Sequence, residues 1–222
     1  GYVLVTAGDM PLLRPQTIKA LGGLAMEGGY AATMLTAVLK DPSGYGRVLR
    51  AQDGSVCGIV EHRDASEVQH RIHEVNASVY CFEVAALLEA LGALGNNNDQ
   101  GEYYLTDCIG YLAEQGRSIG ALIASDPAEC LGVNDRAQLA VTEKVLRERL
   151  IREHMDEGVT FIDPDNTYVE YGVEIGRDTI IYPGNTLQRG TRIGCGCTLL
   201  PGNRICNSVV GMIKDMANLF VT

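Results

Sequence analysis

The sequence contains no run of about 18 apolar residues that could cross a membrane, and no signal-peptide pattern precedes its first apolar segment. Basic residues are also in the minority, since 28 acidic side chains stand against 18 basic ones and leave a net charge of −10 at pH 7. This balance is unfavourable for a protein that binds nucleic-acid backbones, although local groups can still hold a small phosphate ligand. We therefore expect a cytoplasmic protein with neither nucleic acid nor membrane among its partners.

The signatures of several enzyme classes are missing as well. There is no G-x-S-x-G, Walker or zinc motif, and the histidines at 62, 70, 73 and 154 show no metal-ligand spacing. The seven cysteines are odd in number and scattered, which favours free thiols in a reducing compartment. Cys195 and Cys197 form a C-x-C pair with Cys206 nearby, which leaves a metal site open, but small side chains at turns are the simpler interpretation.

A repeat of six residues is present near the end of the chain. Because each short unit buries its apolar side chain only by stacking on the next, this period predicts a parallel β-helix of hexapeptide repeats. The Pro-Gly pairs at 183 and 201 stand three hexads apart, which predicts one coil per three hexads and little more than two coils. The apolar positions of the repeat are Val169, Ile175, Ile181, Leu187, Ile193, Leu199 and Ile205, and Gly184, Gly190, Gly196 and Gly202 keep the same step.

The residues before the repeat alternate between strand and helix patterns, which predicts a layered α/β sheet. Asp53-Gly54 is a strong hairpin signal between two short strands, and a short helical segment is expected over 65–72. The other strand patterns cover 2–6, 30–39, 75–81 and 118–123, and the helical patterns cover 15–28, 84–94 and 105–115.

A long charged helix is expected from Asp135 to about Met155, and such a helix suits an arm between two domains. We therefore divide the chain into an α/β domain over 1–136, a helical arm over 137–157 and a β-helix domain over 158–222. After Gly211 the apolar residues change to helical spacing. The segment 212–222 is either a capping helix over the solenoid end or an artefact of a truncated gene.

Two candidate ligand-binding residues lie at element boundaries. Asp9 follows the first strand, and open α/β sheets bind ligands beyond the carboxyl ends of their strands. A carboxylate there can hold Mg²⁺ against phosphates, and Gly8 lets the backbone approach a ligand, whereas a turn or a helix cap is the alternative. Asn134 begins the long helix, so capping is also its alternative, and Asp135 with Gln138 could also form a box-like cap.

Three further candidates are Gly46, Glu61 and Asn76. Gly46 belongs to the stretch Gly44-Tyr45-Gly46-Arg47, which can expose backbone N–H groups to a ligand or form an ordinary flexible turn. Glu61 and Asn76 are polar residues at or within apolar strands, so each needs a partner. Sugar hydroxyls or neighbouring backbone groups could supply it.

Taken in order, six segments and the hexads resemble one bacterial family, the bifunctional N-acetylglucosamine-1-phosphate uridyltransferase/glucosamine-1-phosphate N-acetyltransferases. The segments are AGDMPLL, DPSGYGRV, GIVEHRDAS, HEVNAS, NNNDQGEYYLTD and GVNDR. The resemblance implies a partial Rossmann-like nucleotidyltransferase domain, a helical arm and the start of a left-handed parallel β-helix. It also implies a multifunctional transferase that makes UDP-N-acetylglucosamine and pyrophosphate from UTP and N-acetylglucosamine 1-phosphate, in the supply of peptidoglycan and lipopolysaccharide precursors.

The resemblance assigns roles to the candidate residues. Asp9 and Asn134 would bind Mg²⁺, and Asn134 would also touch the nucleotide sugar. Gly46 would offer its backbone to the acetamido region of the sugar, while Glu61 and Asn76 would bind sugar hydroxyls. The family usually has Asn-Thr-Gly where this chain has Asn-Ala-Ser at 76–78, so the backbone contacts beside Asn76 are open.

Other parts of the family pattern do not occur among these 222 residues. The glycine-rich L-x-A-G-x-G-T-R-M loop, a lysine and the Q-x-G-T-G stretch that bind UTP are absent, and so are the later coils of the acetyltransferase. We therefore expect that this chain alone completes neither reaction. Acetyl-CoA binding and a homotrimer are expected of the full-length parent.

Two alternatives stay open at this point. One is another nucleotidyltransferase with a β-helix tail, such as an ADP-glucose or mannose-1-phosphate enzyme. The other is a hexapeptide acyltransferase or a trimerisation module without catalysis. Acyl transfer by this piece is disfavoured, because such enzymes usually use a histidine and the last histidine, His154, precedes the hexads.

Overall fold

The computed structural model describes residues 1–96 and 100–211. They divide into two compact units, one formed by Gly1–Asn134 and the other by the residues from Asp135 onwards. Across the described residues, no helix has both the length and the apolar character needed to span a bilayer.

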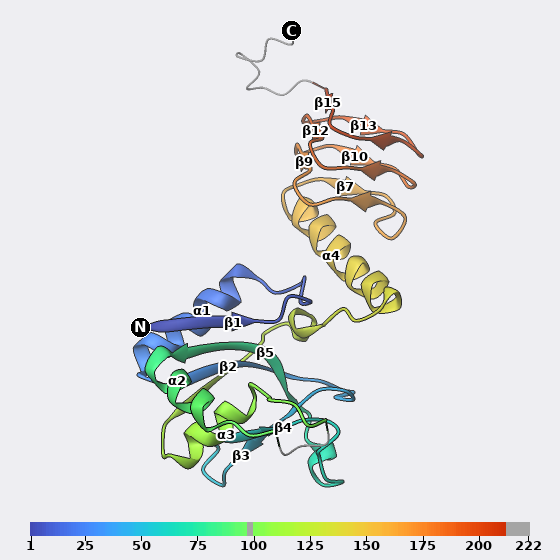
Figure 1. Cartoon of the computed structure of the whole chain (residues 1–222). Coiled ribbons are helices and arrows are strands. Elements are labelled where there is room, and N and C mark those ends of the chain that lie inside the picture. Colours follow the sequence, from blue (N-terminus) through green and yellow to red (C-terminus); the bar gives the residue numbers. More distant parts are fainter. Residues whose placement is uncertain (97–99, 212–222) are drawn as a thin grey trace. The chain divides into compact units, whose positions relative to one another are not determined.

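A six-stranded mixed sheet forms the centre of the first unit (Figure 1). Its order is β4-β3-β5-β2-β6, with β1 paired to β5. Only β2 and β6 pair in parallel within the described part of this sheet, and the other pairs are antiparallel. The α/β class is thus as predicted. The strands are β1 (Tyr2–Thr6), β2 (Ala32–Val38), β3 (Arg47–Arg50), β4 (Val56–Val60), β5 (Glu74–Glu83) and β6 (Ile119–Ile123).

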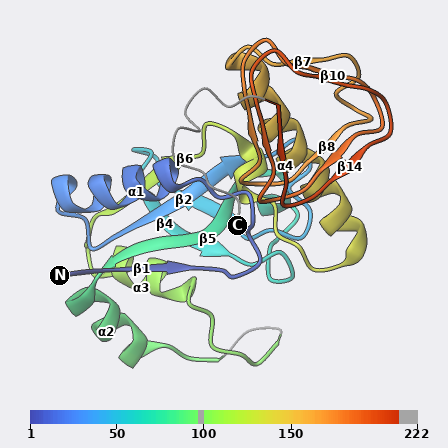
Figure 2. The same cartoon turned by 90° about the horizontal axis from the view of Figure 1, so that it is seen from above.

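Helices cover both faces of this sheet (Figure 2). One core contains Leu21 and Ala25 of α1 (Pro15–Gly28), and the other contains residues of α2 (Val84–Ala93) and α3 (Asp107–Glu114). Strand β5 contributes to both, because alternate side chains point to opposite faces of a strand. Val75, Ala77, Val79 and Cys81 pack on the α1 side, and Tyr80 and Phe82 pack on the α2–α3 side.

Local signals located most elements within a few residues. The hairpin at Asp53-Gly54 is confirmed, since β3 and β4 pair on either side of it and Gly54 has φ 85°. The helix expected over 65–72 is wrong in extent, because only the 3₁₀ turn η1 (Gln69–Arg71) forms there. No residue of η1 is buried, so packing against the core does not stabilise a longer helix there.

The second unit begins with α4 (Arg136–Asp156), which is followed by short strands. The strands stack in three parallel sheets, β13-β10-β7, β14-β11-β8 and β15-β12-β9 (Figure 1). The 18-residue coil is confirmed, because Ile180 pairs with Thr198 and Thr186 with Arg204. The arrangement is compatible with a β-helix. The strands are β7 (Thr160–Phe161), β8 (Tyr168–Val169), β9 (Glu174–Ile175), β10 (Ile180–Ile181), β11 (Thr186–Leu187), β12 (Arg192–Ile193), β13 (Thr198–Leu199), β14 (Arg204–Ile205) and β15 (Val209–Val210).

The hexad residues form the core of this unit. Ile181 and Leu187, in the middle coil, are fully buried, whereas Ile205 in the last coil is only partly buried. Ile151 of α4 joins the same core. Close stacking also needs glycine at 176, because a Cβ there would lie 2.5 Å from the backbone nitrogen of Cys195.

The remaining expectations for this region concern cysteines and the chain end. Cys195 and Cys206 are exposed and Cys197 is partly buried, all as free thiols. Within residues 1–96 and 100–211 no group of three or more His, Cys, Asp or Glu side chains is placed to hold a metal ion. The expected capping helix over 212–222 lies outside the described residues.

Candidate functional site

Asp9 and Asn134 come from distant parts of the chain and meet at one backbone turn. Asp9 is exposed in the turn after β1, and its carbonyl oxygen accepts a hydrogen bond from the N–H of Val133 at 2.9 Å. A Cβ on Gly132 would lie 3.3 Å from Oδ2 of Asp9 and 4.0 Å from Nδ2 of Asn134. Both side chains therefore flank the same space, which is open because residue 132 is glycine.

This arrangement suits a small divalent cation. Mg²⁺ prefers oxygen ligands and often takes only one or two from the protein. Asp9 supplies a carboxylate, and rotation of the Asn134 amide exchanges its nitrogen and oxygen at the same place. The pair is thus able to present two oxygens to one ion.

The helix-cap alternative for Asn134 does not hold. The N-cap of α4 is Asp135, whose Oδ1 accepts a hydrogen bond from the N–H of Gln138 at 2.7 Å. Of the two caps that the sequence left open, the structure therefore has the one formed by Asp135. Asn134 itself is exposed and lies next to Asp9. Gly8 is exposed too, and a Cβ there would meet nothing within 4 Å, so its backbone is open to a ligand.

Gly46, Glu61 and Asn76 form a second group. A Cβ on Gly46 would lie 3.3 Å from Oε2 and 3.4 Å from Oε1 of Glu61, so the carboxylate packs directly on this glycine. The N–H of Asn76 donates to the carbonyl of Gly46 at 2.9 Å. Pairing of β3 with both β4 and β5 produces this group, because it places the residues that flank these strands side by side.

Two residues of this second group were not predicted from sequence. The hydroxyl of Thr106 donates to Oε1 of Glu61 at 3.0 Å. Tyr80 is buried beside them, and burial is the main cause that raises the pKa of its hydroxyl, with the Glu61 charge acting in the same direction. The sequence around Thr106 and along β5 contains no pattern that predicts these contacts with Glu61.

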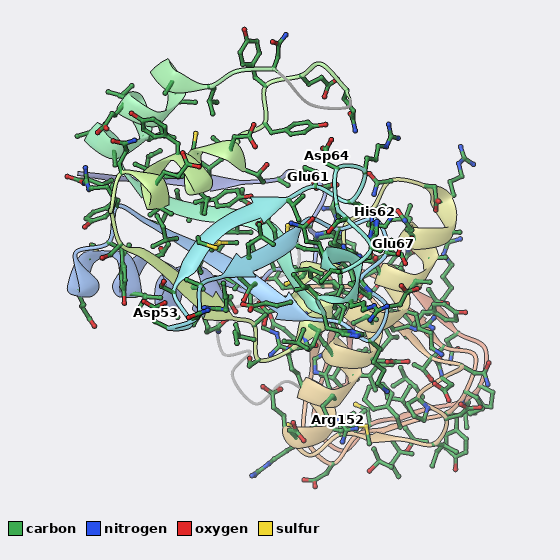
Figure 3. The ribbon with its side chains drawn as sticks, turned by 90° about the horizontal axis from the view of Figure 1, so that it is seen from below. Asp53, Glu61, His62, Asp64, Glu67 and Arg152 are labelled. Atoms are coloured by element: carbon green, nitrogen blue, oxygen red, sulfur yellow. The ribbon has the colours of Figure 1, made fainter. Side chains whose placement is uncertain are left out.

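A cavity of about 300 Å³ opens beside Glu61. It is lined by the end of β1 with Ala7, by Ser78 and Tyr80 of β5, and by residues 103–106. Figure 3 shows Glu61, His62 and Asp64 together in the loop after β4, away from Asp53 at the hairpin turn. The cavity thus combines a carboxylate, hydroxyls and aromatic rings, which suits a small polar ligand.

Tyr45 connects the two groups. Its hydroxyl lies 3.5 Å from the carbonyl oxygen of Cys130, in the segment that carries Asn134. Burial raises the pKa of Tyr45, and the Asp9 charge contributes to the rise. The neighbour of Tyr45 along the chain is Gly46, so one loop contacts both groups. The backbone bond from Ala7 N–H to the Ser78 carbonyl, at 3.2 Å, joins the same two regions.

Asn76 is buried and its side chain shapes the following backbone. Its Oδ1 accepts a hydrogen bond from the N–H of Ser78 at 3.1 Å. Ser78 has φ 54°. This left-handed conformation costs a residue that has a Cβ about 1–2 kcal/mol, whereas glycine adopts it readily. The family resemblance places glycine at this position, so the serine here carries strain that the usual residue avoids.

Ser78→Gly is therefore expected to raise the free energy of unfolding by about 0.5–1 kcal/mol, because relief of strain outweighs the extra flexibility of glycine in the unfolded chain. Thermal unfolding of the first unit measures the change. Ser118→Gly is the matched control, since Ser118 is exposed and lacks a positive φ, and it is expected to lower stability. Equal losses in the two variants would contradict the strain at 78.

The fold defines a protein with an α/β unit and a unit of stacked six-residue repeats. No family model matches the sequence. Among curated proteins, it is 51% identical over 211 residues to the "Bifunctional protein GlmU" of Clostridium acetobutylicum, which covers 95% of this chain and 46% of that protein. It is 46% identical over 221 residues to the protein of the same name from Acetivibrio thermocellus, covering 100% of this chain and 48% of that protein.

A third relative, the GlmU protein of Clostridium botulinum, is 48% identical over 219 residues, with 99% of this chain and 47% of that protein covered. The chain spans about half the length of the curated relatives that it matches. Over the part of those proteins that it matches, the chain belongs to the GlmU family.

Proposed function

We propose that this chain carries the sugar-binding and cation-binding parts of a uridyltransferase site. The parent reaction joins N-acetylglucosamine 1-phosphate to UTP and yields UDP-N-acetylglucosamine and pyrophosphate. The observation that carries the proposal is the convergence of Asp9 and Asn134 on the space above Gly132, from positions far apart in the sequence. The six family segments and the identity to GlmU proteins support the same assignment.

In this proposal the second group binds the sugar. Glu61 accepts from Thr106 through Oε1, and its remaining lone pairs can accept from sugar hydroxyls. Asn76 holds the turn at Ser78 through its side-chain oxygen, while its amide group is a donor for a further hydroxyl. Gly46 brings its backbone against the acetamido region, since no side chain stands between the loop and Glu61.

The first group holds the phosphate region. A Mg²⁺ ion held there would supply positive charge beside the α-phosphate of UTP. In the proposed reaction, a phosphate oxygen of N-acetylglucosamine 1-phosphate bonds to the α-phosphorus, and the bond from that phosphorus to the pyrophosphate oxygen breaks. Asp9 and Asn134 would hold that ion, and Tyr45 keeps the loop of Gly46 against the Asn134 segment. The chain's contribution is positioning and charge neutralisation, because phosphoryl transfer needs little covalent work from the protein.

We propose the finer architecture and partners on the same basis. The mixed sheet would be part of a Rossmann-like nucleotidyltransferase domain over 1–136, and 137–157 would be an arm to a left-handed β-helix over 158–222. In the full-length parent, this second domain would add acetyl-CoA-dependent acetylation of glucosamine 1-phosphate and assemble a homotrimer in the cytoplasm.

A calorimetric titration of the chain with N-acetylglucosamine 1-phosphate in the presence of Mg²⁺ tests the sugar assignment. Binding is expected to be tighter than that of glucose 1-phosphate or mannose 1-phosphate, because only the first has an acetamido group for the Gly46 loop. A preference for one of the other two would favour a different sugar-nucleotide enzyme. Failure to bind any of the three sugar phosphates would favour a trimerisation module without catalysis, and sedimentation of the chain as a monomer would rule that module out.

Gly46→Ala is expected to weaken that binding about tenfold, because the added Cβ lies 3.1 Å from Cγ2 of Ile59 and within 3.4 Å of both Glu61 oxygens and must displace them. Gly58→Ala, on β4, is the matched control, since its Cβ would meet only ordinary contacts at 3.8 and 3.9 Å. It is expected to leave the affinity within about twofold. Equal affinities for both variants would remove Glu61 and Gly46 from the sugar site.

A further inference from the structure

Glu129 is a buried carboxylate outside the residues assigned so far. It lies in η2 (Pro127–Cys130), and 1% of its surface is exposed. Its Oε2 accepts two hydrogen bonds, from the backbone N–H of Arg14 at 3.1 Å and from the hydroxyl of Thr17 at 2.6 Å. Its Oε1 lies 3.8 Å from Nε of Arg14. Glu129 therefore binds a segment more than a hundred residues away in the sequence.

The bound segment is the start of α1, which has no side-chain cap of its own. Arg14 is the N-cap residue of α1 and makes no side-chain cap hydrogen bond. Glu129 satisfies the N–H of Arg14 from outside the helix, and a negative charge is favourable at a helix N-terminus. A second contact, between Nη2 of Arg14 and Oδ2 of Asp126 at 3.1 Å, ties the same two segments.

Each end of this link is a short stretch of chain away from a proposed cation ligand. Arg14 follows Asp9 by five residues, and Asn134 follows Glu129 by five residues. The intervening backbone is held by turns, with Leu13 N–H bonded to the Met10 carbonyl at 3.4 Å. On the other side, the N–H of Leu131 donates to the Ala128 carbonyl at 3.2 Å. Movement of either end of the link would therefore shift a cation ligand.

We propose that Glu129 is a positioning residue that holds Asp9 and Asn134 at the separation one divalent cation requires. The inference rests on the proposed function of those two residues. Burying a carboxylate is costly unless its hydrogen bonds are satisfied, and an apolar residue would fill the same space more cheaply. The contacts of Glu129 tie its own segment, which leads to Asn134, to the start of α1, which follows Asp9. Groups that orient metal ligands typically change metal affinity 10–100-fold when removed.

Binding of Mn²⁺ to the whole chain, followed by electron paramagnetic resonance, tests the inference. Glu129→Leu keeps the side-chain volume and removes both acceptors, and we expect it to weaken Mn²⁺ binding about tenfold. Glu129→Gln keeps one carbonyl oxygen, which can accept from both Arg14 and Thr17, and is expected to restore the affinity to within about twofold. Glu83→Gln is the matched control, since Glu83 pairs with Arg117 at 2.7 Å on the surface.

Amide hydrogen exchange supplies a readout that needs no metal. The N–H of Val133 bonds to the carbonyl of Asp9, so it reports whether the two segments stay together. We expect Glu129→Leu to accelerate its exchange while amides of the central strand β2 keep their protection. If Glu129→Leu does not fold, Thr17→Val removes one of the two hydrogen bonds and is expected to produce the same changes at smaller size.

The outcomes distinguish failure of the proposed cation site from failure of the positioning role of Glu129. If Asp9→Asn leaves Mn²⁺ binding unchanged, or the chain binds no Mn²⁺, the cation site itself is wrong. If Asp9→Asn abolishes binding but Glu129→Leu retains the original affinity and Val133 protection, the cation site stands and the positioning role is overturned. A loss that Glu129→Gln fails to restore also overturns it, because the role assigned here depends on the hydrogen bonds that glutamine can keep.

Discussion

Asp9→Asn is expected to weaken binding of a divalent cation to this chain at least about a hundredfold, because it replaces the charged oxygen ligand of the pair by a neutral amide of the same shape. The shape is kept, so the backbone bond between Asp9 and Val133 is expected to persist. Calorimetric titration with Mn²⁺ measures the affinity, and amide exchange at Val133 verifies that the turn is intact.

The matched control for Asp9 is Asp53→Asn. This substitution makes the same change of charge at the hairpin turn, away from the loop that carries Glu61 (Figure 3). We expect it to leave cation affinity within about twofold, because Asp53 is exposed and its carboxylate accepts hydrogen bonds from Ser55 within the hairpin turn. Equal losses in both variants would mean that the cation responds only to net charge, and the site at Asp9 and Asn134 would be wrong.

Leu187→Ala is expected to lower the free energy of unfolding of the second unit by about 3–5 kcal/mol. Leu187 is fully buried, and its strand β11 is stacked between β8 and β14. Truncation leaves a cavity that neighbours on both sides cannot fill, because each coil is held by hydrogen bonds to the next. Hydrogen exchange of the amides at 186–188 measures the loss within this unit.

Ile205→Ala is the control at the equivalent position of the last coil. Ile205 pairs in register with Leu187, but it is only partly buried and β14 has a described neighbour on one side only. Its truncation is expected to cost about 1–2 kcal/mol, because less apolar surface is returned to water. Equal costs at 187 and 205 would show that the coils do not stabilise one another by stacking.

The six-residue repeat is the part of the structure that the sequence predicts best. Apolar residues at a period of six predict stacked short strands, and Ile181, Leu187 and Ile193 are all buried in them. The prediction succeeds because the same parallel pairing, 18 residues apart, repeats from coil to coil. The hairpin at Asp53-Gly54 and the strand Tyr2–Thr6 were accessible as well, since turn chemistry and apolar pattern act within a few residues.

Predictions from the sequence were wrong or could not be made where contacts between distant segments determine the structure. The segment 65–72 was expected to be helical but forms only a single 3₁₀ turn, because none of the residues of η1 is buried and Val68 is exposed, so packing does not stabilise further turns. The sheet is mixed, and nothing local indicates that β1 pairs with β5 in antiparallel orientation. Ser78 also has an ordinary local sequence, and its positive φ is visible only in the folded chain.

The candidate site likewise has residues that the sequence indicates and contacts that only the structure reveals. The sequence indicates the candidate residues one by one. Asp9 follows a strand, Gly46 lies in a glycine-rich loop, Glu61 and Asn76 are polar residues at or within apolar strands, and Asn134 begins the long helix. The sequence does not indicate the hydroxyl of Thr106 on Glu61 or the carboxylate of Glu129 on α1, because each contact joins segments that are remote in sequence.

Composition, the six-residue period and the turn residues are readable from the chain alone, because they express interactions between neighbours. Which side chains share a pocket depends on how β1, β3 and β5 pair and on how the segment before Asn134 returns to Asp9. Those contacts join segments that are remote in the sequence, so no local pattern specifies them. Their geometry is therefore a property of the tertiary structure.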